Sequence, residues 1–122
     1  MSDWNFFLAK RLLREFERSR LCFIGSLEDL DLVWTIGYGQ RMGKPVGMKQ
    51  LSTGEFGAPK TVQRRLERLR RLGIVAQAQS DGDARCVQLY LTPATLARLE
   101  EYKAFIVENG MESRDPELRH RA

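Results

Sequence analysis

The chain has 122 residues, of which 43% are hydrophobic, so it can bury one small core but not a second independent domain. Its formal net charge of +4 is only weak support for a polyanionic partner. No run approaches the roughly 18 consecutive apolar residues of a membrane-spanning helix, and no apolar signal segment stands at the start. We therefore expect a soluble, cytoplasmic protein.

A first helix is predicted close to the start, with Asp3 as its cap. Its apolar positions cover more than one stripe, which a single small core does not need. They are Trp4, Phe6, Phe7, Leu8, Leu12, Leu13 and Phe16. The width of this face fits either burial on two sides within the domain or a dimer contact, and the sequence does not choose between them.

A second helix is predicted after Gly25, because Ser26 and Asp29 have the spacing of a capping box. It should end at about Tyr38, before a glycine-rich segment. Its expected inner face consists of Leu30, Val33, Trp34 and Gly37.

A helix-turn-helix is predicted over about residues 48–72. Residues 48–53 form a short third helix, residues 54–57 a tight turn, and Pro59 stands at the first positions of a fourth helix, where proline is favoured. Apolar residues recur along this fourth helix at helical spacing and give it one buried edge. They are Val62, Leu66, Leu69 and Gly73.

Positive charge is concentrated on the same helix. Residues 60–71 contain six cationic residues and one carboxylate, so the rest of the chain carries a net charge of −1. This distribution is typical of one element that meets a polyanion. A solvated helix face is the alternative, and it weighs more for Arg65, Arg70 and Arg71 than for the residues at the start of the helix.

A β-hairpin is predicted next, over about residues 74–91. Residues 74–79 and 86–91 form its strands and residues 80–83 its turn. A helix-turn-helix followed by a hairpin is a winged helix, so the expected fold class is mainly α with a small β-hairpin wing.

A fifth helix is predicted from Pro93 to about Asn109. Its inner side should consist of Leu96, Leu99, Tyr102, Phe105 and Ile106. Residues 111–122 contain few apolar groups and are expected to be a flexible tail, which leaves residues 1–110 as a single domain.

The start of the fourth helix would point into the major groove of double-stranded DNA. Arg64 can donate twice to guanine, and Gln63 can pair in the same way with adenine. Lys60 and Thr61 are expected on phosphates, near the free amides of the helix start.

Within the predicted hairpin, Asp83-Ala84-Arg85 is followed by five residues and then by Leu91-Thr92. This motif, at this spacing, resembles the wing signature of the MarR family of bacterial transcriptional regulators. Further matches within residues 46–99 are Leu51, Thr61-Val62, Leu69 and Gly73-Ile74-Val75. The resemblance implies that Arg85 enters the minor groove while Asp83 braces it. A surface ion pair in a turn is the alternative.

The resemblance also implies a regulator, here a repressor, that binds DNA as a homodimer through helices 1 and 5 and responds to a possible small-molecule effector. The sequence departs from the family at Thr95, where glycine is usual, and at Gln77, where arginine is common. The expected DNA-binding residues are Pro59, Lys60, Thr61, Gln63, Arg64, Arg68, Asp83 and Arg85.

Two other classes of function remain. A winged helix can dock proteins without touching DNA. An enzyme would need clustered catalytic groups, but the acidic residues 28–31 are explained by helix capping, and His120 is the only histidine. We therefore expect no catalysis, metal or cofactor. Cys22 and Cys86 are expected to be buried, inert thiols rather than redox sensors.

Overall fold

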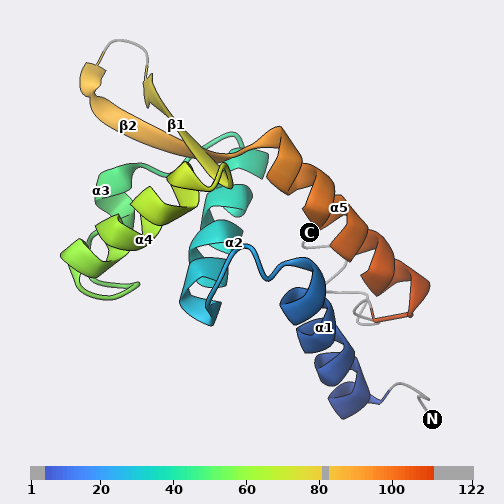
Figure 1. Cartoon of the computed structure of the whole chain (residues 1–122). Coiled ribbons are helices and arrows are strands. Elements are labelled where there is room, and N and C mark those ends of the chain that lie inside the picture. The colour runs from blue at the N-terminus through green and yellow to red at the C-terminus, as the bar shows by residue number, and fades with distance from the viewer. Residues whose placement is uncertain (1–4, 81–82, 112–122) are drawn as a thin grey trace. The chain divides into compact units, whose positions relative to one another are not determined.

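The computed structural model describes residues 5–80 and 83–111, and in residue 80 and residues 83–85 it describes the backbone only. Helices and an antiparallel hairpin follow one another in the predicted order, and the prediction of a mainly α fold with a hairpin wing is confirmed (Figure 1). The elements are α1 (Phe6–Arg20), α2 (Leu27–Arg41), α3 (Met48–Leu51), α4 (Pro59–Arg71), β1 (Val75–Ser80), β2 (Asp83–Leu91) and α5 (Pro93–Glu108).

The chain divides into two compact units. Residues 23–97 form the central unit, which holds α2, α3, α4 and the hairpin, and the terminal unit combines residues up to 22 with those from 98 onward. The single domain expected over residues 1–110 stays a prediction, and the expected tail, from residue 112 on, lies outside the described residues. None of the described helices has the length and apolar character needed to cross a membrane.

Helix α2 begins as predicted. Ser26 Oγ accepts from the amide of Asp29 at 3.2 Å, and the Asp29 carboxylate accepts from the amide of Ser26 at 3.1 Å. The helix continues past Tyr38 to Arg41, because its glycines allow close packing instead of ending it. A Cβ on Gly39 would lie 2.8 Å from the carbonyl oxygen of Lys44.

The buried face of α2 differs in part from the predicted one. Leu30 and Val33 are buried as expected, but Trp34 is 39% exposed. Leu32 and Ile36 take the inner positions that the sequence analysis missed, and Asp29 is buried with them. The inner face of the helix is therefore rotated from the predicted one.

The helix-turn-helix follows. Helix α3 ends at Leu51 and a turn leads to α4, which begins at Pro59 as predicted. The predicted apolar edge of α4 is confirmed at Val62, Leu66 and Leu69, which are at most 2% exposed. Its fourth predicted member, Gly73, follows the helix and is exposed. Burial of this edge leaves the cationic residues of α4 on its outer faces.

The hairpin pairs Val75 with Leu91 and Gln77 with Leu89, and the register shifts between Gln79 and Ser80. Leu89 and Leu91 are buried on one face of β2, and Gln88 and Tyr90, which alternate with them, are half-buried. Strand β2 begins at Asp83 rather than at Cys86. The centre of the predicted turn, residues 81–82, lies outside the described residues.

Thr95 joins the hairpin to α5. It is 1% exposed, and its hydroxyl donates to the carbonyl oxygen of Ile74 at 2.9 Å. A buried threonine therefore satisfies its own polar group at a position where the MarR family usually has glycine.

Replacing Thr95 with valine is expected to lower the free energy of unfolding by about 1 kcal/mol, because the hydroxyl becomes a methyl group and its hydrogen bonds to Ile74 and to the Thr92 hydroxyl are lost. Urea denaturation measures this change. Thr61→Val is the control, because Thr61 is exposed on α4. Equal stability of the two variants would contradict a contribution from the Thr95 hydroxyl.

The terminal unit is built on aromatic contacts. Asn5 caps α1, because its side chain accepts from the amide of Leu8 at 3.0 Å. The predicted cap, Asp3, lies outside the described residues. The Phe16 ring stacks on that of Tyr102 with centroids 4.8 Å apart. The pKa of Tyr102 is raised mainly by burial. The hydrogen bond that its hydroxyl donates to Glu17 raises the pKa further.

The predicted inner side of α5 is only partly correct. Tyr102 is buried and Leu99, Phe105 and Ile106 are half-buried, but Leu96 is 40% exposed. The helical spacing places Leu96 on the predicted stripe, but the side chain that is buried in this first turn is the hydrogen-bonded Thr95.

The prediction of buried cysteines is wrong, because both side chains are exposed. After α1, the core position is taken by Leu21, which is 2% exposed, and the next residue, Cys22, faces solvent. Cys86 precedes Val87, where the regular pairing with β1 stops.

Candidate nucleic-acid interface

The start of α4 presents a polar and cationic surface. Pro59, Lys60, Thr61, Gln63 and Arg64 are all exposed. The first turn holds no carboxylate, and no side chain caps the helix at Ala58. Amides of the first turn, together with the positive end of the helix dipole, are therefore available to an anion.

Lys60 and Arg64 lie one helical turn apart on this surface. Neither has an ion-pair partner within the part of the chain that the structure describes. Their charges are not neutralised internally, so both can meet phosphate or a base edge.

Arg65 and Arg68, further along α4, are bonded inside the central unit. Arg68 Nη1 donates to the carbonyl oxygen of Ile24 at 2.8 Å and to Asp29 Oδ2 at 3.3 Å. Arg65 Nη1 donates to Ser26 Oγ at 3.0 Å and lies 3.6 Å from Asp29 Oδ1. That Arg68 binds DNA stays a prediction. Its bonds to Ile24 and Asp29 favour instead a role in holding α4 against the start of α2.

At the far end of α4, Arg70 is paired with Glu67 through two hydrogen bonds of 2.7 and 3.2 Å. These bonds lower the pKa of Glu67 and raise that of Arg70. The cationic charge that remains unpaired is therefore weighted toward the start of the helix.

The hairpin and the N-terminal end of α4 extend toward the same side of the central unit, to the left in Figure 1. Asp83 and Arg85 belong to β2, but their side chains lie outside the described residues. The brace between them and the minor-groove contact of Arg85 stay predictions. Gln77, where the family often has arginine, is exposed on β1.

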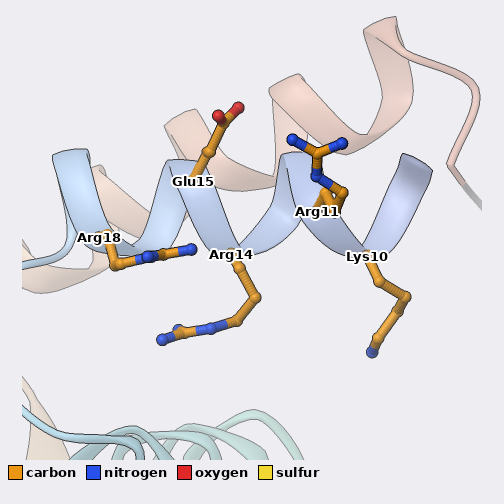
Figure 2. Close-up of a pocket in the computed structure, with 5 residues that line it drawn as sticks. All are labelled: Lys10, Arg11, Arg14, Glu15 and Arg18. Carbon is orange, nitrogen blue, oxygen red and sulfur yellow. The ribbon is translucent and has the colours of Figure 1, made fainter. Parts of the chain in front are cut away.

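A second cationic surface lies on α1, in the terminal unit. It surrounds a shallow groove of about 270 Å³, drawn in Figure 2. The lining residues are Lys10, Arg11, Arg14, Glu15 and Arg18. The sequence analysis missed this surface, because the net charge of −1 outside residues 60–71 averages it with acidic segments elsewhere.

Another groove, of about 360 Å³, lies beside the end of α2 in the central unit. Its lining is mixed apolar and polar, with one cation. The lining residues are Thr35, Tyr38, Gly39, Met42, Lys44 and Val46. Among the side chains that the structure describes, no three of histidine, cysteine or carboxylate type gather as a metal site would require.

Asp29 is the residue of this region that the sequence analysis assigned only to helix capping. Its two arginine partners lie 36 and 39 positions further along the chain, so only the folded structure brings them together. A carboxylate in a capping box gives no signal of such a contact.

The helix-turn-helix with its hairpin defines a winged-helix protein. No protein-family model matches the chain, and a search of curated proteins finds no match. Solved structures do match. The structure of S. aureus MepR with DNA is 15% identical with a TM-score of 0.67, and the match covers 98% of this chain and 90% of that one.

Two further matches agree with the first. Streptococcus pneumoniae FabT in complex with DNA is 21% identical with a TM-score of 0.56, and the match covers 93% of this chain and 83% of FabT. MarR is 16% identical with a TM-score of 0.52, and the match covers 94% of this chain and 83% of MarR. The chain therefore has the winged-helix fold seen in MarR-family regulators.

Proposed function

We propose that the chain is a cytoplasmic, sequence-specific regulator that binds double-stranded DNA, acting as a repressor. The main support for this proposal is the start of α4, where exposed cationic and amide side chains lie opposite a fully buried edge. The first turn of the helix contains no carboxylate. Such a surface fits the major groove. The DNA complexes of MepR and FabT, which share the fold, support this proposal.

Each residue at the start of α4 has a defined role in the proposal. Arg64 reads guanine and Gln63 reads adenine through paired hydrogen bonds. Lys60 and Thr61 hold phosphate together with the first-turn amides, and Pro59 fixes the helix start beside them. Asp83 and Arg85 of the wing complete the interface at the minor groove.

The active unit in this proposal is a homodimer that binds a near-palindrome, with α1 and α5 as the interface. Support comes from exposed apolar residues on both helices, since large apolar groups left in solvent mark interaction surfaces. They are Phe6, Phe7 and Leu8 of α1 and Val107 of α5. A small-molecule effector is part of the proposal, and the groove beside the end of α2 is its candidate site.

Selection of bound duplexes from a random DNA library, followed by titration at several salt concentrations, tests this function. We expect two related half-sites and an affinity that falls by about 0.9 log units per log unit of salt for each phosphate neutralised. The absence of DNA binding, or binding that salt does not weaken, would reject the proposal. The absence of DNA binding, together with salt-insensitive binding to a protein, would favour a protein-docking module.

A further inference from the structure

Asp29 is a buried carboxylate between α2 and α4. It is 4% exposed, and Oδ2 accepts from the amide of Ser26 at 3.1 Å and from Arg68 at 3.3 Å. Oδ1 lies 3.6 Å from Arg65 Nη1 and has no hydrogen bond within the described residues. The two guanidinium groups of α4 therefore compensate one buried negative charge.

Gly25 makes room for this arrangement. Its φ of +111° is in the region that favours glycine, and a Cβ there would lie 2.6 Å from Asp29 Oδ2 and 2.9 Å from Arg68 Nη1. Arg68 passes this point to reach the carbonyl oxygen of Ile24 at 2.8 Å. The backbone before α2 is thus shaped to receive a side chain from α4.

A buried carboxylate is costly without a charged partner. If Arg65 and Arg68 turned toward DNA phosphates, Asp29 would lose both cations while staying out of water. Lys60 and Arg64 are exposed and neutralise no buried carboxylate, since neither has an ion-pair partner within the described residues. Two cations of α4, Arg65 and Arg68, are therefore held internally by Asp29, and the two at the start of the helix are not.

We infer that Asp29 is a positioning residue of the DNA-binding helix, which keeps Arg65 and Arg68 from binding DNA phosphates and fixes α4 against the start of α2. This inference rests on the proposed function and refines it. Restricting the phosphate contacts limits sequence-independent binding, so that Arg64 and Gln63 account for a larger share of the affinity.

The Asp29→Asn variant tests the inference. Asparagine keeps the shape and can still accept from Ser26, but it releases the two arginines. We expect tighter binding to random duplex DNA and a salt dependence steeper by about 0.9 log units per log unit for each arginine that reaches a phosphate. Asp31→Asn is the matched control, since Asp31 is exposed on the same helix and the change in net charge is identical.

Arg68→Gln gives a second test that does not depend on the first variant. Its salt dependence is expected to match that of the unmodified chain while its melting temperature falls, whereas Lys60→Gln should make the salt dependence shallower by about 0.9 log units per log unit. A shallower slope for Arg68→Gln, or equal slopes for Asp29→Asn and Asp31→Asn, would overturn the inference. Failure of the unmodified chain to bind DNA would instead reject the proposed function.

Discussion

Leu69→Ala is expected to lower the free energy of unfolding by about 2–5 kcal/mol, since the substitution leaves a cavity in a packed core. Leu69 is fully buried on the inner edge of α4, with Val62 and Leu66. The exposed residues at the start of the helix are untouched. A urea denaturation curve followed by circular dichroism measures the loss.

Leu72→Ala provides the matched control, because Leu72 caps the same helix and is 53% exposed. It should change the free energy of unfolding by about 0.5 kcal/mol or less. Similar losses in both variants would mean that the inner edge of α4 is not a core element, which would contradict the buried edge on which the orientation of the helix depends.

Local patterns account for the parts of the fold that were predicted well. The capping box of Ser26 and Asp29 and the proline at the start of α4 act within a few residues of themselves, so their consequences can be inferred without the rest of the chain. The apolar spacing along α4 is equally local and equally strong. Together these signals were enough to place the helix-turn-helix.

Predictions failed where distant segments decide the outcome. The glycine-rich segment after Tyr38 is predicted to break the helix, yet Gly39 lies inside α2, where the missing Cβ lets the carbonyl oxygen of Lys44 approach closely. Trp34 and Leu96 are apolar at helical spacing but remain well exposed. Periodicity shows which residues share a face, and only the packing partners decide how much of that face is covered.

At the candidate site, the sequence predicts which side chains are exposed but not which cations are paired internally, for the same reason. The exposure of Lys60, Gln63 and Arg64 follows from the amphipathic pattern of α4. The pattern does not separate these residues from Arg68, because the difference lies in Asp29, a residue of another helix. Counting cations along a sequence overestimates the number available to a partner when some are paired internally.

The charge reversal Arg64→Glu is expected to weaken binding to the selected DNA site about 10- to 100-fold or more at fixed salt. A bidentate contact to guanine contributes about 1–3 kcal/mol of discrimination, and the new carboxylate adds repulsion from neighbouring phosphates. Arg64 is exposed and outside the core, so the fold should be retained. A gel-shift titration measures the affinity, and a circular dichroism spectrum checks the fold. Arg85→Glu should have a similar effect through the wing.

Arg70→Glu separates a local contact at Arg64 from the general effect of net charge. Both arginines belong to α4 and both variants change the charge equally, but Arg70 lies near the end of the helix and is already paired with Glu67. A loss of DNA affinity confined to Arg64→Glu would identify the start of α4 as the recognition surface. Equal losses would mean that α4 attracts DNA only through its total charge, and an unchanged affinity in Arg64→Glu would remove Arg64 from the interface.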